Sequence, residues 1–328
     1  MSSSPRVMSA ARLHGVRDLR VETLPVPEPS ATELLVRVEA CGVCPTDVRK
    51  FLIGTDESAY PLNPGHEWVG RVVEVGGDVR DWQAGDRVYG DTYAGYAEYA
   101  VLDTRGSRWS HGPLRLDDGM PTDRAVFIEP LADCIHAVRH QARVGEGDHV
   151  VVVGAGQMGL QLVAVAHAAG SNVLAVDPLE PRRELALRFG AAEAVPADGW
   201  EQHAREWAAG AGVAAVILAL GRADAVDPAL AALAPGGRLV LFAGFGDQAV
   251  RPVDLNLVHY QELSIIGSEW VGTPPNQRLE CYEDARTLLR DGGLDLERLV
   301  TSHCTLDTLV NAFTHVERHQ AMKIVLTP

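Results

Sequence analysis

Three residues in the first third of the chain have side chains that commonly bind transition metals. Cys44 is followed by His66 and Glu67, which lie in the sequence Pro-Gly-His-Glu. A thiolate, an imidazole and a carboxylate are ligand types of a catalytic zinc site, which keeps one position open for water or substrate. Glu129, in the sequence Ile-Glu-Pro-Leu, is a further carboxylate beside an expected helix start. Together these residues indicate a catalytic rather than a structural metal site.

The spacing of the cysteines argues against a structural zinc site. Cys41 and Cys44 form a C-x-x-C pair, but no second pair follows, and Cys134, Cys281 and Cys304 are scattered. A four-cysteine structural site needs two such pairs. Considered one at a time, the candidate ligands also fit ordinary roles, such as a core histidine or a carboxylate at a helix start.

A glycine-rich turn in the middle of the chain indicates a dinucleotide site. Residues 154–159 read Gly-Ala-Gly-Gln-Met-Gly, follow a run of valines and open a helical pattern. In such a turn the first glycine allows the tight bend, the second lets the backbone approach a pyrophosphate, and the third allows close helix packing. The free N–H groups of the helix start then face the anion. We predict cofactor contacts from Gly154, Gly156, Met158 and Gly159.

An acidic residue after the next strand points to the preferred nucleotide. Asp177 stands at the spacing expected for a carboxylate that binds the ribose hydroxyls. A carboxylate there would repel a 2′-phosphate, which favours NAD over NADP. Arg182 and Arg183 follow closely, either as solvated helix residues or as contacts to the adenosine ribose, and they leave some tolerance for NADP.

The elements that must position these residues follow two kinds of pattern. Up to about residue 144 the chain predicts short strands broken by glycine and proline, typical of a small barrel or sandwich. They are expected at residues 34–40, 68–75 and 95–101, and residues 85–88 lead into a further short strand. From residue 145 strands and helices alternate, which predicts a doubly wound α/β domain. Its strands are expected at 149–153, 172–176, 213–220, 238–242 and 262–266, its helices at 158–169, 181–189 and 223–233, and a turn at 235–237. Helices at 277–290 and 306–315 and a strand at 323–326 complete the chain.

Composition narrows the classes of function. The chain has 328 residues, with 29 Lys plus Arg and 44 Asp plus Glu, and a net charge of −15. Such an acidic chain without a basic block is a poor ligand for nucleic acid. It has no apolar run long enough to span a bilayer and no secretory signal, and its five cysteines show no disulfide rhythm. We therefore expect a cytoplasmic protein without membrane or nucleic-acid partners.

Several motifs in a fixed order are far more specific than any one of them. With these motifs, essentially all of residues 8–327 resembles the medium-chain dehydrogenase/reductase superfamily, in its zinc-dependent alcohol and polyol dehydrogenase branch. The resemblance is closest to the sorbitol and threonine dehydrogenases, which use Glu-Pro-Leu where ethanol-type enzymes place a cysteine ligand. The motifs are CGVCPTD at 41–47, GHEWVG at 65–70, GDRV at 85–88, IEPL at 128–131, the glycine turn at 154–159, Asp177, and SIIGS at 264–268.

The resemblance implies a domain organisation and a set of zinc ligands. It implies a GroES-like β-rich catalytic domain (1–144), a Rossmann NAD-binding domain (145–272) and a C-terminal segment (273–328) that returns to the catalytic domain. Cys44 and His66 would be zinc ligands, and Glu67 and Glu129 would compete for, or exchange at, the third position.

It also implies supporting roles for other residues. Thr46 matches the hydroxyl that begins a proton relay, and Asp47 would support the zinc site through a ligand. Cys41 would be a packed thiol. Lys323 resembles the basic residue that meets the cofactor pyrophosphate, with a solvent-facing strand end as the alternative.

Two departures from the family pattern change these expectations. The lobe of four closely spaced cysteines that binds a structural zinc is absent, and residues 91–96 (DTYAGY) replace a much longer stretch. One catalytic zinc and no structural zinc is therefore expected. Arg49 stands where many relatives have the histidine that passes the proton to solvent. Because arginine does not deprotonate in proteins, the proton must leave through ribose hydroxyls and water, or through another base such as Lys50.

The expected function is hydride transfer between NAD and the secondary alcohol of a polyol, sugar alcohol, cyclitol or amino alcohol. Zinc would act as a Lewis acid, NAD would accept the hydride, and Thr46 would take the hydroxyl proton. The alternatives are a zinc enzyme that mainly reduces carbonyls, a zinc-free quinone or enone reductase, and a catalytically silent nucleotide-binding protein. The expected partners are a small alcohol or ketone and further copies of the chain, as a homodimer or homotetramer. Tyr93, Tyr96 and Trp270 are candidates for the substrate pocket, although aromatic residues there are more often packing residues.

Overall fold

The chain divides into two compact units, one of which is discontinuous in sequence. The computed structural model describes residues 6–56, 59–107, 110–210, 212–246 and 249–328. Unit 1 comprises Met1–Glu129 and Pro274–Pro328, and unit 2 comprises Pro130–Thr273. The second boundary lies one residue from the expected position. The first lies before residue 145, because the helical residues that follow Pro130 pack on strands and a helix of unit 2.

Unit 1 is built on a mixed seven-stranded sheet and a two-stranded ribbon. In the larger sheet the order is β14-β15-β3-β4-β5-β7, with β6 also paired to β3, while β1 and β2 pair with each other. The last strand of the chain is antiparallel to β3, so the C-terminal segment completes this sheet. The strands are β1 (Val7–Gly15), β2 (Asp18–Pro25), β3 (Glu33–Gly42), β4 (Trp68–Val75), β5 (Arg87–Gly90), β6 (Tyr99–Asp103), β7 (Leu114–Arg115), β14 (Val300–Cys304) and β15 (Lys323–Leu326).

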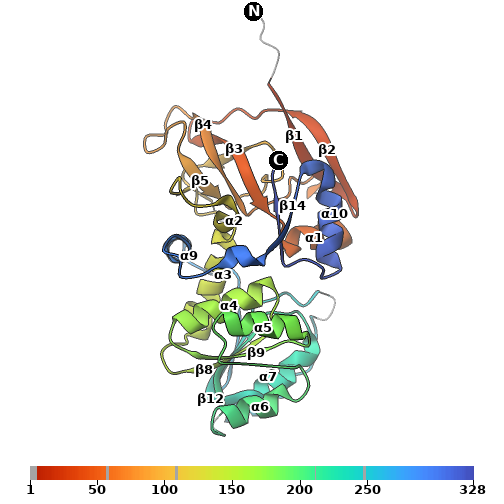
Figure 1. Cartoon of the computed structure of the whole chain (residues 1–328), viewed down its shortest axis with the longest axis vertical. Helices are drawn as coiled ribbons and strands as arrows, with labels where there is room; N and C mark the ends of the chain where they lie inside the picture. The colour runs from red at the N-terminus through yellow and green to blue at the C-terminus, as the bar shows by residue number, and fades with distance from the viewer. Residues whose placement is uncertain (1–5, 57–58, 108–109, 211, 247–248) are drawn as a thin grey trace, which may run out of the picture. The chain divides into compact units, whose positions relative to one another are not determined.

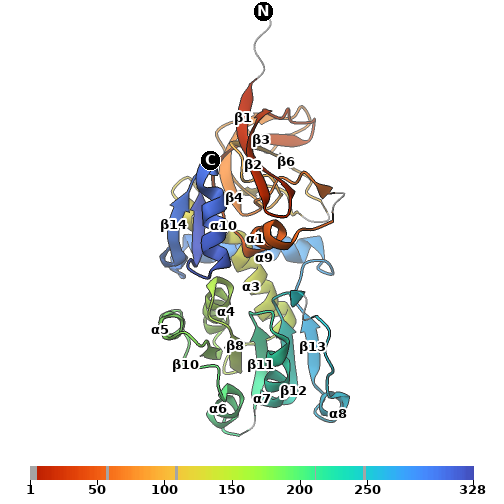
Figure 2. The same cartoon turned by 90° about the vertical axis from the view of Figure 1, so that its right-hand side faces the viewer.

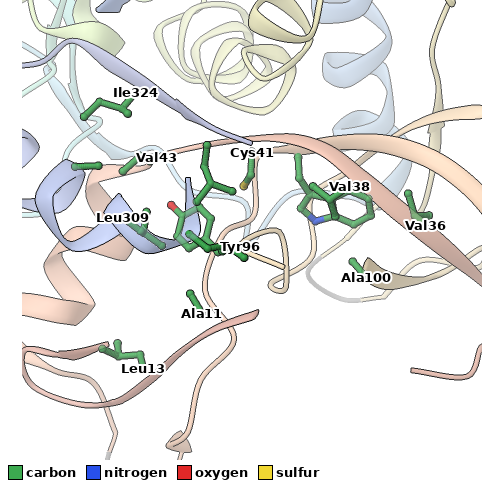
Figure 3. Packing of buried hydrophobic residues seen from close by; sticks show 14 of the residues in the cluster. Ala11, Leu13, Val36, Val38, Cys41, Val43, Tyr96, Ala100, Leu309 and Ile324 are labelled. Carbon is green, nitrogen blue, oxygen red and sulfur yellow. The ribbon is translucent and has the colours of Figure 1, made fainter. Parts of the chain in front are cut away.

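Helices from both ends of the sequence cover the core of unit 1. Helices α1 and α10 lie side by side, with the rings of Phe51 and Phe313 5.4 Å apart (Figure 1). Cys41 and Tyr96 lie in this apolar core with residues of the C-terminal segment such as Leu309 (Figure 3). The helices are α1 (Pro45–Ile53), α2 (Thr122–Ala125), α9 (Pro275–Arg290) and α10 (Leu309–Glu317), with short 3-10 turns at Leu296–Leu299 and Leu306–Thr308. Helix α3 (Ile128–Ile135) begins at the end of the first segment.

Unit 2 is a six-stranded parallel sheet with the strand order β10-β9-β8-β11-β12-β13 (Figure 2). This is the order of a doubly wound dinucleotide-binding sheet, whose strand order reverses at the first strand, here β8. Strand β8 lies between β9 and β11, and this central position explains its continuous valine run. The strands are β8 (His149–Val153), β9 (Asn172–Val176), β10 (Glu193–Val195), β11 (Val213–Leu218), β12 (Leu233–Leu241) and β13 (Ser264–Gly267).

Helices connect these parallel strands. They are α4 (Gln157–Ala168), α5 (Glu180–Arg188), α6 (Trp200–Trp207), a 3-10 turn (Ala223–Ala225), α7 (Val226–Ala232) and α8 (Leu255–Tyr260). A π-helix, η2 (His136–Ala142), continues α3 and packs on β11, β12 and α4. Among the residues that the structure describes, every helix is too short or too polar to cross a membrane.

Most of the expected elements are confirmed, and two differ in an instructive way. The turn expected at 235–237 lies inside β12 as an irregularity, where Val213 pairs with Leu233 but Ala215 pairs with Arg238. The strand expected at 95–101 begins only at Tyr99, because the residues before it bond to other segments of unit 1. The α/β fold class with a β-rich unit and a parallel-sheet unit is confirmed.

Candidate metal and cofactor sites

Two neighbouring antiparallel strands bring the candidate ligands together. Cys44 follows β3 and occupies the N-cap of α1, while His66 and Glu67 directly precede β4. Since Cys41 pairs with Trp68 in this ladder, the C-terminal end of β3 lies beside the N-terminal end of β4. The ligand atoms of Cys44, His66 and Glu67 all lie within 4.8 Å of one another. Residues from two separate parts of the sequence thus form one cluster with the donors that zinc prefers.

Asp47 holds the imidazole of His66. Its Oδ2 lies 3.2 Å from His66 Nδ1 and accepts a hydrogen bond from the Tyr96 hydroxyl at 3.2 Å. The Asp47 carboxylate is only 1% exposed, so these contacts fix it inside unit 1. A carboxylate on one ring nitrogen fixes the orientation and tautomer of a histidine and leaves the other nitrogen for a metal.

The protonation of the cluster depends on these contacts. Burial would lower the pKa of His66, but Asp47 and Cys44 outweigh it and raise that pKa well above its usual value. Burial, together with Glu67, raises the pKa of the Cys44 thiol. Without a metal the cluster therefore retains protons, and a bound zinc ion would displace them, since zinc needs a thiolate and a neutral imidazole. The residues present fit the ion in number and in chemistry.

Glu67 has a partner that the sequence did not reveal. The ammonium of Lys323 donates a hydrogen bond to Glu67 Oε2, and the two side chains are 0% and 1% exposed. The absence of a side chain at Gly42 makes this possible, because a Cβ there would lie 2.1 Å from Glu67 Oε2. A buried ammonium needs such a charged partner. Lys323 therefore sits beside the metal cluster within unit 1, and its contact with a cofactor pyrophosphate stays a prediction.

The other predicted residues around this cluster are placed as follows. Glu129 is half-buried in the first turn of α3, its backbone N–H donates to the Tyr89 hydroxyl at 3.3 Å, and it is not part of the three-residue cluster. Thr46 is exposed in the first turn of α1. Cys41 is fully buried in the apolar core, so it is a packed thiol as expected. The roles of Glu129 as third ligand and of Thr46 as proton acceptor remain predictions.

The glycine turn of unit 2 has the geometry of a pyrophosphate site. Gly154 has φ +98°, and a Cβ on Gly159 would lie 1.7 Å from the Gly154 carbonyl oxygen. Gly156 is the N-cap of α4, and a Cβ there would meet no atom within 4 Å. The first and third glycines are thus required by the fold, whereas the second leaves open space in front of a helix N-terminus. That space fits the pyrophosphate of a dinucleotide.

Asp177 stands at the end of β9 and contacts this turn. Its Oδ2 accepts from the backbone N–H of Ala155 at 2.9 Å and its Oδ1 from that of Leu179 at 2.9 Å. Arg182 lies 3.8 Å from the same carboxylate. Met158 is half-buried at the start of α4, the helix that the glycine turn opens. The structure therefore places Asp177 and Arg182 next to the glycine turn, as a nucleotide site requires.

The chain matches two family models in succession. The first is the alcohol dehydrogenase GroES-like domain at residues 30–112, and the second is the zinc-binding dehydrogenase at residues 149–289.

Relatives match along nearly the whole length. The chain is 27% identical to the sorbitol dehydrogenase of Bombyx mori, with 97% of each protein covered. It is 29% identical to the L-threonine 3-dehydrogenase of Streptomyces coelicolor, covering 92% of this chain and 94% of that protein. The crystal structure of 2R,3R-butanediol dehydrogenase from Bacillus subtilis superimposes with a TM-score of 0.86 at 24% identity, covering 98% of this chain and 99% of the other. This last likeness establishes the fold.

Proposed function

Because the chain belongs to the zinc-dependent medium-chain dehydrogenases, we propose that it transfers a hydride between NAD and the secondary alcohol of a polyol, cyclitol or amino alcohol. It is an enzyme that acts on CH–OH groups of small molecules and uses zinc and a nicotinamide cofactor. The alternative of a catalytically silent protein is therefore wrong. The cluster of Cys44, His66 and Glu67, backed by Asp47, is the observation that carries the proposal.

Each side chain of the cluster has a distinct task in this proposal. Zinc, when bound, supplies a Lewis acid that favours loss of the alcohol proton. Cys44 and His66 would hold the ion, and Asp47, through its contact with His66 Nδ1, would keep the imidazole in place. Glu67 and Glu129 are the candidates for the third ligand. Lys323 neutralises part of the Glu67 charge, which makes Glu67 the weaker of the two as a permanent ligand and suits it to exchange.

The reaction balances as alcohol plus NAD⁺ giving ketone, NADH and one proton. The nicotinamide accepts the hydride. Thr46, exposed at the start of α1, takes the hydroxyl proton onward. The exposed Arg49 cannot accept that proton, so it must pass from Thr46 to solvent through ribose hydroxyls and water, or through another base.

The choice of NAD over NADP rests on Asp177. Its carboxylate is bound on both oxygens by backbone N–H groups, which keep it at the end of β9 beside the glycine turn. A fixed negative charge there disfavours a 2′-phosphate and accepts hydrogen bonds from ribose hydroxyls. Arg182 lies close enough to offset part of this charge, so discrimination is strong but incomplete.

An exposed sheet edge supports association of the chain with a second copy. Strand β13 is the outer strand of the unit 2 sheet, and Ile265 on it is 40% exposed. Leu255 and Tyr260 of the preceding α8 are 75% and 74% exposed. An exposed edge strand of this kind offers unpaired N–H and C=O groups to an identical strand related by two-fold symmetry. We propose a homodimer through β13, which light scattering coupled to size-exclusion chromatography would measure.

A substrate panel tests the proposed activity. Zinc-loaded protein with NAD⁺ should produce NADH, seen by absorbance, with members of a panel of polyols, cyclitols and amino alcohols. Removing zinc with a chelator should abolish the signal, and adding zinc should restore it. Turnover that persists in metal-free protein would contradict the mechanism. Activity on ketones with NADH, without measurable alcohol oxidation, would favour the reductase alternative.

A further inference from the structure

A cavity in unit 1 adjoins the metal cluster, and the mechanism above leaves it unused. Its volume is about 230 Å³, below the usual range for drug-sized ligands, which restricts it to a very small molecule or to part of a larger one. Leucine and proline side chains form much of its wall, and Asp47, Lys50, Asn63 and Tyr93 supply its polar groups. Tyr93 is 48% exposed, so the cavity reaches the surface of the unit.

Two residues that line the cavity, Asp47 and Tyr93, also contact His66. The Tyr93 ring centroid lies 4.9 Å from that of His66, and Asp47 Oδ2 lies 3.2 Å from His66 Nδ1. A molecule in the cavity would therefore contact Asp47 and Tyr93, the two residues that also contact the predicted zinc ligand His66.

Lys50 is half-buried and lines this cavity. It stands in the last turn of α1, its ammonium donates to the Tyr93 hydroxyl, and its Nζ lies 3.8 Å from the Tyr93 ring centroid. An ammonium has three N–H donors, and the Tyr93 hydroxyl uses one. The remaining donors give the cavity a positive group that can bind an acid.

Asp47 is the negative group that lines the same cavity. Its Oδ2 contacts His66 and Tyr96, and, despite burial, the charges of His66 and Lys50 lower the pKa of Asp47. Lys50 is the cation of the cavity lining and is the group that can bind an acid there. In a chain with a net charge of −15, a cation beside the reaction site is also what an anionic substrate needs in order to approach.

We propose that Lys50 binds an acidic group of the substrate, so that the enzyme prefers alcohols that carry a carboxylate or a phosphate. This inference rests on the proposed function and narrows its substrate class. Tyr93 is the positioning residue, since its hydroxyl and ring hold the ammonium at the cavity.

Binding to the zinc-loaded protein without cofactor tests this proposal independently of turnover. Calorimetry would compare galactitol 1-phosphate with galactitol, and L-threonine with 1-amino-2-propanol, which lacks the carboxylate. The acidic member of at least one pair should bind about tenfold more tightly, as a charged hydrogen bond allows. The two pairs distinguish phosphate from carboxylate.

Three variants separate a specificity role from a structural one. Lys50→Met should remove the difference within the preferred pair, and Lys50→Arg should retain most of it. Arg49→Met is the matched control, because Arg49 is the neighbouring cation of α1, is exposed and does not line the cavity. It should leave the difference unchanged, and zinc content should stay equal in all variants.

Two results would overturn the proposal. In the first, neither acidic compound binds more tightly than its neutral partner. In the second, Lys50→Met weakens both members of a pair equally, which would mean that Lys50 acts through Asp47. If the wild-type protein oxidises neutral alcohols in either case, the proposed function stands and only the role of Lys50 fails. If it oxidises no alcohol at all, the function fails, and the binding comparison still decides the role of Lys50.

Discussion

Among single residues, Asp47 and Lys323 control the two adjacent members of the metal cluster. Asp47 contacts and orients His66, and Lys323 forms an ion pair with Glu67 that neutralises part of its charge. Both supporting residues are buried, so water does not screen their charges. Metal binding by His66 and Glu67, as proposed above, would therefore depend on two residues that are not among the proposed ligands.

Replacing Cys44 with serine should remove zinc and turnover together. A serine hydroxyl is a poor zinc ligand at neutral pH, and loss of the Lewis acid should lower kcat/KM by about a thousandfold or more. Elemental analysis and NADH absorbance would measure the two effects, and NAD binding should change little. Cys41→Ala is the matched control, because Cys41 is a buried thiol outside the cluster and should leave zinc in place. Full zinc content in Cys44→Ser would contradict the ligand assignment.

Replacing Asp177 with alanine should weaken NAD more than NADP. The variant loses hydrogen bonds to the ribose, worth roughly ten- to a hundredfold in affinity, and also loses repulsion of the 2′-phosphate. Loss of the contacts to Ala155 and Leu179 affects both nucleotides alike. Dissociation constants for NADH and NADPH, measured by fluorescence, give the ratio. An equal loss for both would remove the ribose assignment.

The sequence alone predicted Cys44, His66 and Asp177 as candidates because each lies in a short motif with a chemical reason for its spacing. The pairing of Lys323 with Glu67 could not be predicted in this way. The two residues are 256 positions apart, and their contact depends on β15 pairing with β3 and on the absence of a Cβ at Gly42. Likewise, the sequence offered Lys50 only as an alternative base for the proton, because nothing local places its ammonium against Tyr93.

Among secondary-structure elements, the start of α4 shows how one motif serves both the fold and the cofactor. The turn must bend after β8, let α4 approach the strand, and still leave the helix N-terminus open. Sequence patterns located this element well, since the buried strand, the glycines and the helix follow one another without a gap. They located β12 less well, because its irregular pairing with β11 is set by the neighbouring strand.

Two alanine substitutions in this turn should differ in effect: one should lower mainly the stability, and the other mainly the affinity for NAD. Gly159→Ala places a Cβ 1.7 Å from the Gly154 carbonyl oxygen and should lower the free energy of unfolding by about 1–3 kcal/mol. Gly156→Ala meets no atom within 4 Å, so the free energy of unfolding should fall by less than about 1 kcal/mol, from the poorer N-cap, while affinity for NAD falls about tenfold. Thermal unfolding and NADH binding would measure both. Unchanged NAD affinity in a well-folded Gly156→Ala protein would show that the pyrophosphate lies elsewhere.

For the molecule as a whole, unit 1 is held together by polar as well as apolar contacts between distant segments. His111 is buried with its side chain 1% exposed, 3.5 Å from the Asp91 carboxylate and with its ring 4.0 Å from that of Tyr282 on α9. Burial lowers the pKa of His111, partly offset by Asp91. The imidazole is therefore kept neutral in the folded protein more readily than in the unfolded chain.

This burial predicts a loss of stability in acid. Because the folded pKa of His111 lies below its unfolded value of about 6.5, the unfolded chain binds more protons as the pH falls through this range. The stability contribution is full above the unfolded value and is lost as the pH falls through the folded one. Between pH 7.5 and pH 5, the thermal midpoint of His111→Gln should therefore fall less than that of the wild type. His259→Gln, at an exposed histidine, should behave as the wild type does. Parallel losses in all three proteins would contradict the assignment.

The discontinuity of unit 1 has a consequence for how the enzyme is made in the cell. Residues 130–273 are contiguous, so unit 2 can fold while the residues that follow it are still being translated. The sheet that carries Cys44, His66 and Glu67 lacks β14 and β15 until the final stretch has been translated. During that interval Glu67 has no ammonium beside it, and strand β3 presents part of an open edge. A nascent chain stalled shortly before Lys323 should therefore be the form most prone to capture by chaperones and to mismetallation.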